Sequence, residues 1–226
     1  MYVILRYEGR TLEDESRRHI AASEGGLSSE SKIQLLQSSI DALSALHGKG
    51  VVHGDLKPNN LLIAHVRDVR NRVCIIDFGM SRMKGDRTST LYSETKIAEF
   101  KDGRRKPQQW IAPELYGTDA SARFLSEASD IYAMGIVWLY IISGWSIDIF
   151  NFIKTTPRYL DLQKTKNEFD AYANRELVDL IFDCFLSQPQ SRPNSNTLKA
   201  EFAKVKSGLS GTWNGPEILL LSYEYP

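Results

Sequence analysis

A stretch without any charged side chain, residues 131–147, constrains the fold of this chain more than any other feature. The stretch is mostly apolar, so a helix formed from it must be surrounded either by protein or by lipid. Glycine and serine residues interrupt it, and Ser126 and Asp130 before it are typical of a helix start in a soluble protein. We therefore expect a helix buried inside a globular domain rather than a membrane span.

The overall composition agrees with a single globular domain. The chain has 226 residues, of which 42% are hydrophobic and 25% are charged, well away from the composition of disordered chains. Lys and Arg together number 28, as do Asp and Glu, so the formal net charge is zero. This balance argues against binding to nucleic acid or to a membrane surface.

Cysteine usage and the first residues suggest the compartment. Cys74 and Cys184 lie far apart and outside any metal-ligand spacing, which indicates neither a disulfide framework nor a zinc site. The apolar run at residues 1–5 ends at Arg6 and is too short for the core of a signal peptide. We expect a cytoplasmic protein, with the nucleus as the alternative.

Apolar spacing predicts one long helix and one hairpin in the first half of the chain. From Ser29 to Leu46 apolar residues recur every three or four positions, and Gly48 follows where a C-cap glycine is common. Two short apolar runs, residues 61–63 and 73–76, flank a polar segment and predict a β-hairpin.

The rest of the chain carries weaker signals. Residues 2–7 suit a strand, residues 12–29 are polar and poorly patterned, and residues 81–107 form a long loop with little periodicity. Further helices are expected after residue 126 and over residues 148–154, 176–186 and 195–205.

A polar segment between the predicted helix and the predicted hairpin carries the strongest chemical signal. Residues 53–60 are His-Gly-Asp-Leu-Lys-Pro-Asn-Asn, which matches H-R-D-L-x-x-x-N at every fixed position except the arginine. Asp-Phe-Gly follows at residues 77–79 and Ala-Pro-Glu at residues 112–114. In this order the motifs resemble those of the eukaryotic protein kinases, and the resemblance covers residues 2–205.

The residue chemistry of this segment agrees with the resemblance. Phosphoryl transfer needs a carboxylate near the attacking hydroxyl, oxygen ligands for Mg²⁺ and a cation near the moving phosphoryl group. The resemblance implies that Asp55 accepts the hydroxyl proton, that Lys57 faces the γ-phosphoryl group of ATP, and that Asn60 and Asp77 hold Mg²⁺. The full set of nucleotide-binding residues that it implies is Tyr7, Glu8, Lys57, Leu62, Asn60 and Asp77.

The implied fold is α+β and similar to that of protein kinases: a mainly helical C-terminal lobe with a small β-hairpin that carries the catalytic and magnesium loops. In this family the motif histidine, here His53, packs against the phenylalanine of Asp-Phe-Gly, here Phe78. A late arginine, here Arg192, pairs with the glutamate of Ala-Pro-Glu, here Glu114. We expect Cys184, on an apolar helix face, to lie in the core.

Two departures from the family pattern are visible. No segment matches the glycine-rich G-x-G-x-x-G loop or the V-A-I-K lysine, and few residues precede the hinge-like residues 3–8. We therefore expect either a fragment of a longer kinase or a natural C-terminal-lobe protein, with a kinase domain over residues 1–206 and a tail over 207–226. Gly54 replaces the arginine that commonly binds an activation-loop phosphate, which argues against activation through that contact.

Three functions remain open from the sequence. The favoured one is a protein kinase that uses ATP and Mg²⁺ to phosphorylate a protein substrate on Ser or Thr, with Tyr as the alternative acceptor. Lys57 is typical of Ser/Thr kinases, whereas Pro107 is more typical of tyrosine kinases. A pseudokinase or scaffold lobe that binds a regulatory protein partner is the second. The third is a small-molecule phosphotransferase of the aminoglycoside or choline kinase type, where His-Gly-Asp also occurs.

Overall fold

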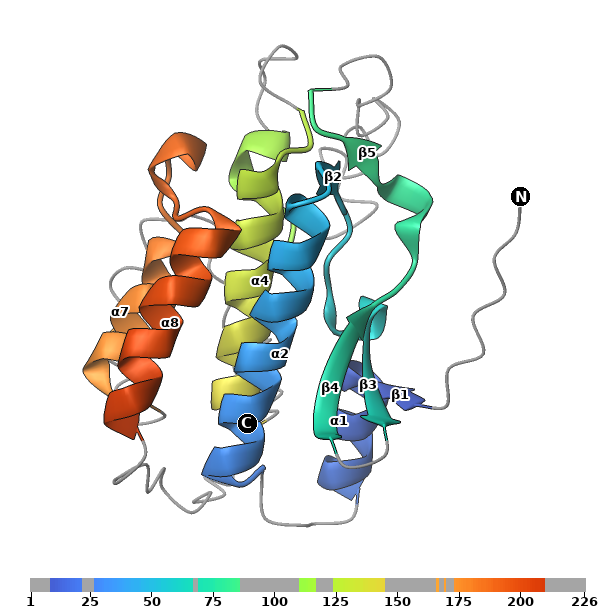
Figure 1. The fold of residues 1–226 in the computed structure, drawn as a ribbon, viewed down its shortest axis with the longest axis vertical. Coiled ribbons are helices and arrows are strands. Elements are labelled where there is room, and N and C mark those ends of the chain that lie inside the picture. Colours follow the sequence, from blue (N-terminus) through green and yellow to red (C-terminus); the bar gives the residue numbers. More distant parts are fainter. Residues whose placement is uncertain are drawn as a thin grey trace, which may run out of the picture.

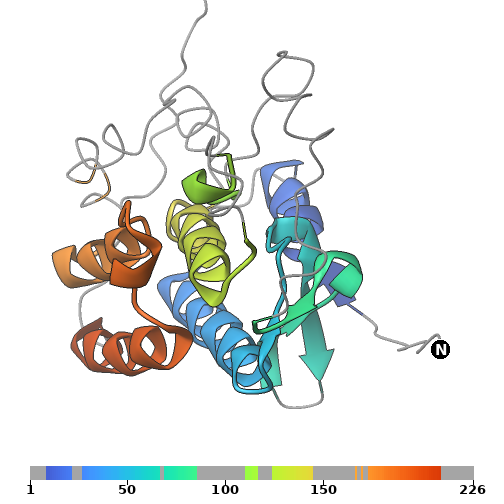
Figure 2. The same ribbon diagram turned by 90° about the horizontal axis from the view of Figure 1, so that it is seen from above.

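Helices and a small sheet lie side by side in the computed structural model of the chain (Figure 1). The structure describes residues 9–21, 27–66, 69–85, 110–116, 124–144, 166, 169 and 173–209. Helix α2, Ser29–His47, lies in the middle (Figures 1 and 2). It packs against a three-stranded sheet and against helices α4, Glu127–Ile142, and α8, Ser195–Leu209. This is the mainly helical α+β arrangement that the sequence predicted.

The charge-free stretch forms most of helix α4, Glu127–Ile142. A capping box starts the helix, because the hydroxyls of Ser126 and Ser129 each accept a hydrogen bond from the other residue's backbone N–H. Every residue from 129 to 142 is buried, which confirms the predicted buried helix. Within the part of the chain that the structure describes, no helix has both the length and the apolar character needed to span a bilayer.

Helix α2, Ser29–His47, confirms the helix predicted from apolar spacing. Ser28 caps its start by accepting a hydrogen bond from the backbone of Ser31. Gly48 follows the helix as predicted, but its backbone is still right-handed, and the left-handed residue is Gly50 with φ of +70°. The helix is buried on several sides because it packs against the sheet, α4 and α8.

The predicted hairpin is formed by strands β3, Leu61–Val66, and β4, Val69–Ile75. The strands are antiparallel, with Leu61 opposite Ile75 and Leu62 opposite Cys74, and both run further than the apolar pattern indicated. A third strand, β1, Gly9–Thr11, pairs with β3 and gives the order β1-β3-β4. The hairpin therefore presents the residues that flank it, Asn60 and Ile76, at one end of the sheet.

Helix α1, Leu12–Ala21, was not predicted, because its sequence lacks an apolar stripe. Polar contacts stabilise it instead: the hydroxyl of Thr11 accepts a hydrogen bond from the backbone of Asp14, and acidic and basic side chains pair one turn apart. The helix is attached to the core through buried Leu12 and through a hydrogen bond from Tyr140 of α4 to Ser16.

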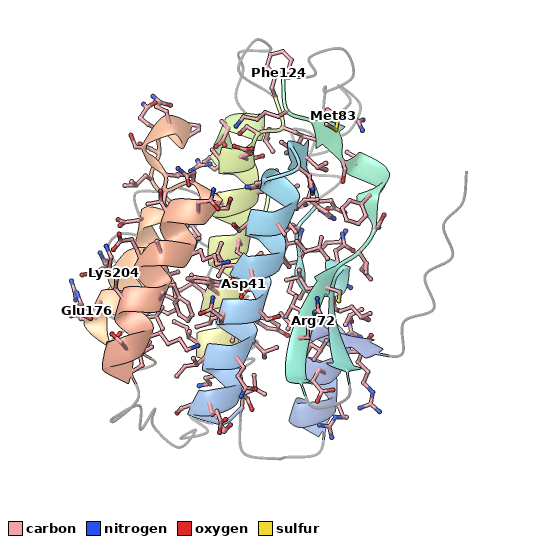
Figure 3. The ribbon with its side chains drawn as sticks, viewed as in Figure 1. Asp41, Arg72, Met83, Phe124, Glu176 and Lys204 are labelled. Atoms are coloured by element: carbon pink, nitrogen blue, oxygen red, sulfur yellow. The ribbon has the colours of Figure 1, made fainter. Side chains whose placement is uncertain are left out.

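The remaining elements are a short ribbon next to residues 53–60 and two helices that pack against α4 and α2. Strands β2, Val51–Val52, and β5, Arg82–Met83, form a two-stranded antiparallel ribbon. Charged side chains such as Glu176 and Lys204 project from the outer faces of the last two helices (Figure 3). Those helices are α7, Arg175–Asp183, and α8, Ser195–Leu209, and both lie close to their predicted positions. Short 3-10 turns are found at η1, Pro58–Asn60, η2, Phe78–Met80, η3, Pro113–Tyr116, and η6, Pro189–Ser191.

Several predictions fall outside the described residues. These are the strand over residues 2–7, residues 86–107 of the predicted long loop, the helix over residues 148–154 and the tail beyond Leu209. The start of the predicted loop contains strand β5, which pairing with β2 creates. The division of the chain at residue 206 stays a prediction.

Candidate active site

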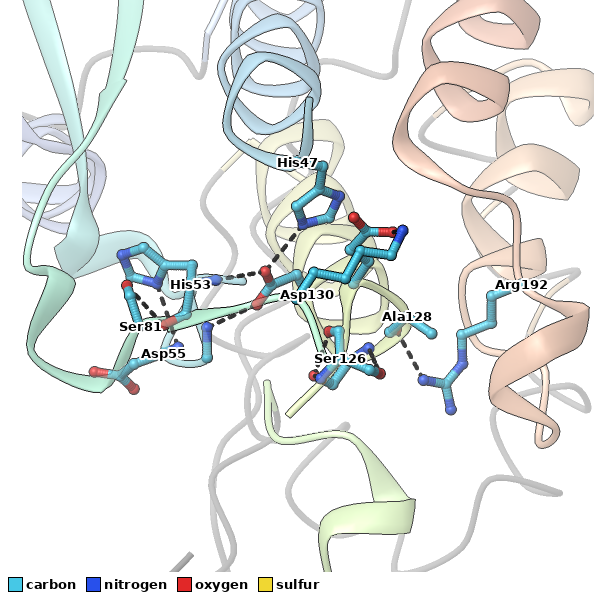
Figure 4. Close-up of polar contacts among 12 residues, drawn as sticks. His47, His53, Asp55, Ser81, Ser126, Ala128, Asp130 and Arg192 are labelled. Atoms are coloured by element: carbon cyan, nitrogen blue, oxygen red, sulfur yellow. Dashed lines mark hydrogen bonds and ion pairs between the residues drawn. The ribbon is translucent and has the colours of Figure 1, made fainter. Parts of the chain in front are cut away.

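A buried carboxylate on α4 holds the loop that follows strand β2 (Figure 4). Asp130 accepts hydrogen bonds from the backbone N–H of His53 at 2.7 Å and of Gly54 at 2.8 Å. Nε2 of His47 lies 3.0 Å from the same carboxylate. Because Asp130 is almost completely buried, these donors compensate for the water that its charge has lost. The loop is therefore attached to the most deeply buried helix of the described structure.

The loop brings three of the predicted site residues into contact. Nζ of Lys57 lies 2.7 Å from Oδ2 of Asp55. The amide nitrogen of Asn60 donates to the backbone oxygen of Asp55 at 2.7 Å and to its Oδ2 at 3.1 Å. These contacts engage one carboxylate oxygen of Asp55 and turn the amide oxygen of Asn60 away from it. The other carboxylate oxygen of Asp55, Oδ1, takes part in neither contact.

Asp77 reaches the same end of the hairpin from strand β4. The backbone N–H of Ile76 donates to the carbonyl of Asn60 at 3.0 Å, so the residue before Asp77 is bonded directly to Asn60. Asp77 has φ of 63° and ψ of 76°, a left-handed conformation that Asp tolerates better than most residues. Its side chain is exposed and accepts a hydrogen bond from the N–H of Gly79 at 3.3 Å.

His53 joins the two loops without being exposed to solvent. Its Nε2 lies 3.0 Å from the carbonyl of Ile76 and its Nδ1 accepts the N–H of Asp55 at 3.3 Å. A carbonyl only accepts, so Nε2 is the donor in this hydrogen bond. The ring packs edge-on against Phe78, with centroids 5.3 Å apart. The packing predicted between His53 and Phe78 is therefore confirmed.

The residues expected to bind the nucleotide base are described only in part. Leu62 is buried in β3, where it lies opposite Thr11 of β1 and Cys74 of β4. Tyr7 and Glu8 lie outside the described residues, and β1 begins at the next residue.

Sequence reasoning missed two polar residues near this end of the sheet. The hydroxyl of Thr11 donates to the carboxylate of Asp14 at 2.7 Å, where β1 leads into α1. Thr11 lies opposite Leu62 of the neighbouring strand β3. The spacing Thr-x-x-Asp, which is typical of a helix start, was the available signal. The anchoring role of Asp130 was also missed, since only the structure shows that its carboxylate faces the loop.

The pair predicted between Glu114 and Arg192 is confirmed. The guanidinium of Arg192 makes two parallel hydrogen bonds to the Glu114 carboxylate, at 2.7 and 2.8 Å. It also donates to the carbonyls of Leu186 and Ala128, and it lies over the ring of Tyr132 at 5.2 Å. Such a bidentate buried pair joins η3 to the start of α4 and to the segment after α7.

Among the described residues there is neither a cluster of metal-binding side chains nor an exposed thiol near the loop. No group of three or more His, Cys, Asp or Glu side chains is placed to hold a metal ion there. Cys184 is completely buried, as predicted, and burial raises the pKa of its thiol above the ordinary value. The chemistry available near the loop is therefore that of carboxylates, an amide and an ammonium group.

Comparison with known proteins agrees with this geometry. The protein kinase domain family matches residues 1–202, so this chain belongs to the protein kinase family. Serine/threonine-protein kinase PknB of Mycobacterium leprae is 29% identical over 216 residues, which cover 92% of this chain and 30% of that protein.

Two fungal relatives are similar to a comparable degree. Serine/threonine-protein kinase ppk34 of Schizosaccharomyces pombe is 30% identical over 165 residues, covering 67% of this chain and 38% of that protein. Mitogen-activated protein kinase kinase kinase mkh1 of Cytospora mali is 27% identical over 207 residues, covering 80% of this chain and 10% of that protein. The chain thus spans well under half the length of each of these three relatives.

Proposed function

We propose that this chain supplies the catalytic and metal-binding loops of a protein kinase that transfers the γ-phosphoryl group of ATP to Ser or Thr hydroxyls in a protein. The observation that carries the proposal is the contact of Lys57 and Asn60 with one oxygen of Asp55, beside the loop that bears Asp77. Relatives whose printed names include serine/threonine-protein kinase favour Ser or Thr over Tyr as the acceptor.

Asp55 is the proposed base. The contacts of its Oδ2 with Lys57 and Asn60 hold the carboxylate in one orientation, which leaves Oδ1 for the acceptor hydroxyl. As the hydroxyl oxygen bonds to the γ-phosphorus, its proton passes to Asp55 and the bond from phosphorus to the ADP oxygen breaks. The ammonium group of Lys57 lies close enough to Asp55 to offset negative charge on the transferring group.

The donor set at Asn60 and Asp77 fits Mg²⁺. The ion prefers hard oxygen ligands, and these residues offer an amide oxygen turned away from Asp55 and an exposed carboxylate. When bound with ATP, Mg²⁺ neutralises phosphate charge. The left-handed backbone at Asp77 and the bond between Ile76 and Asn60 keep the two side chains at one end of the hairpin.

The base and sugar of ATP have proposed partners on the sheet side of the site. Leu62 supplies an apolar surface for adenine. Tyr7 and Glu8, which directly precede strand β1, are assigned to the same pocket from the family pattern. The hydroxyl of Thr11 and the carboxylate of Asp14 suit hydrogen bonds with ribose hydroxyls.

The two other functions have less support. A scaffold lobe does not need catalytic groups, yet Asp55, Lys57, Asn60 and Asp77 are all present. The relatives named above are protein kinases, which favours a protein acceptor over a small molecule.

The proposal is tested by separating metal binding from proton transfer. Calorimetric titration of the full chain with Mg-ATP should show about tenfold weaker binding in Asp77→Asn, because a charged ligand is lost. Asp55→Asn should bind with wild-type affinity but transfer no ³²P-labelled phosphate to a generic protein substrate. Asp41→Asn, which changes a half-buried carboxylate on α2 that pairs with Lys199, is the matched control (Figure 3). Equal affinity of wild type and Asp77→Asn would contradict the metal assignment.

A further inference from the structure

The turn at Gly54 has no room for a side chain. Gly54 has φ of +79°, a left-handed conformation. A Cβ atom at this position would lie 2.6 Å from Cδ1 of Leu125 and 3.2 Å from the carbonyl oxygen of Met80. Leu125 and the backbone of Met80 therefore pack directly against the backbone that leads into Asp55.

Leu125 belongs to the same rigid unit as Asp130. It directly precedes Ser126, whose capping box starts α4, and its side chain packs against the apolar core. The start of α4 thus touches Gly54 twice: the carboxylate of Asp130 accepts its N–H at 2.8 Å, and Leu125 covers its Cα. The helix fixes both contacts because its own start is fixed by the capping box.

The segment after Asp77 closes the turn from the other side. The hydroxyl of Ser81 donates to the carbonyl of His53 at 3.1 Å, and β5 pairs with β2, with Arg82 opposite Val52. Nζ of Lys84 lies 2.8 Å from the carboxylate of Glu127 and links the end of β5 to the start of α4. The loop that carries Asp55 is consequently enclosed between α4 and β5.

We propose that Leu125 is a positioning residue: its side chain holds the left-handed turn at Gly54 and thereby directs the carboxylate of Asp55. The functional meaning of this role rests on the proposed function, in which Asp55 is the base. Gly54 stands where the protein kinase pattern has an arginine that commonly binds phosphate, and here Leu125 packs directly against it.

Amide hydrogen exchange at the turn tests the proposal without any nucleotide. Leu125→Val deletes the Cδ atoms that contact Gly54, so the amides of Gly54 and Asp55 should exchange about tenfold faster than in the wild type. Leu27→Val is the matched control, because Leu27 is also a partly buried leucine that directly precedes an N-cap, Ser28 of α2. It should leave exchange at Gly54 and Asp55 unchanged.

A conservative variant separates positioning from general loss of packing. Leu125→Met retains an apolar atom at the δ position and should restore slow exchange at Gly54 and Asp55. The proposal would be overturned if Leu125→Val and Leu27→Val speeded amide exchange at Gly54 and Asp55 equally. It would also be overturned if Leu125→Val did not speed that exchange. If Mg-ATP fails to bind the chain, the proposed function fails, whereas the exchange result still decides the role of Leu125.

A second comparison uses the steric match itself. Gly54→Ala adds left-handed strain, a clash with Leu125 and a close approach to the carbonyl oxygen of Met80. Leu125→Ala removes the packing that holds the turn, but in the double variant it also relieves the clash with the new Cβ atom. The double variant should therefore exchange more slowly at Asp55 than the product of the two single effects would give. If the exchange rate at Asp55 in the double variant equals the product of the two single effects, the two residues are not directly coupled.

Discussion

Helix α4 and the loop of residues 53–60 beside it are held in different ways. Every residue of α4 from 129 to 142 is buried, and apolar contacts such as Trp138 against Phe202 hold it in place. Residues 53–60 instead depend on a few hydrogen bonds, several of them to Asp130 or Asp55, and on the contact of Leu125 with Gly54. The stability of the domain and the geometry of the site therefore rest on different interactions, which meet at Asp130.

The largest effect should come from the core side of this comparison. Trp138 is fully buried and donates a hydrogen bond to Ser39 at 2.9 Å. Trp138→Ala should lower the free energy of unfolding by about 3–5 kcal/mol, measured by urea denaturation. The ratio of amide exchange rates between the loop and α4 should stay close to the wild-type value. A loop that loses protection selectively would show that the two regions are not independent.

Asp130→Asn attacks the point where the two regions meet. An amide keeps the shape of the carboxylate but directs an NH₂ group at a backbone N–H, so the free energy of unfolding should fall by about 2–3 kcal/mol. The amides of His53 and Gly54 should lose more protection than those of α4. Uniform loss of protection would indicate that Asp130 serves only the fold.

Ser81→Ala is a milder change on the loop side. It removes the hydrogen bond from the Ser81 hydroxyl to the carbonyl of His53, which is partly buried. We expect a loss of about 1 kcal/mol in unfolding free energy, with faster exchange confined to β2, β5 and the turn between His53 and Asp55. Ser207→Ala, an exposed serine on α8, is the control and should change neither quantity.

The smallest effect concerns a charge at the end of α7. Burial raises the pKa of the Asp183 carboxyl, and nearby Lys166 opposes that shift. The folded chain then binds this proton more tightly than the unfolded chain, so ionisation of Asp183 lowers stability as the pH rises above the unfolded pKa. Asp183→Asn should be slightly more stable than wild type at pH 7, and this difference should shrink toward pH 4. If the stability difference between Asp183→Asn and wild type instead grows as the pH falls, the pKa of Asp183 is not raised in the folded chain.

Elements with a strong local pattern were predictable from the sequence. Helices α2 and α4 have apolar repeats and capping residues, and the β3–β4 hairpin has two apolar runs. Helix α1 was missed because polar contacts stabilise it rather than an apolar stripe. Strands as short as β2 and β5 contain too few residues to show alternation, and pairing across the fold creates them.

The site divides in the same way. The motif spacing pointed to Asp55, Lys57, Asn60 and Asp77, and family resemblance anticipated the contacts of His53 and Arg192. The contacts of Asp130 with the loop and of Leu125 with Gly54 join segments far apart in the chain. No local pattern encodes such contacts, because they depend on how α4 packs beside the loop.

Paramagnetic broadening by Mn²⁺ with ATP tests the central claim most directly. Mn²⁺ favours the same oxygen ligands as Mg²⁺ and broadens NMR signals of nearby nuclei. If the loops form one metal-nucleotide site, broadening in the full chain should centre on the amides of Asn60 and Asp77. It should disappear in Asp77→Asn and persist in Asp41→Asn. Broadening spread evenly over exposed acidic side chains, and unchanged in Asp77→Asn, would contradict the account.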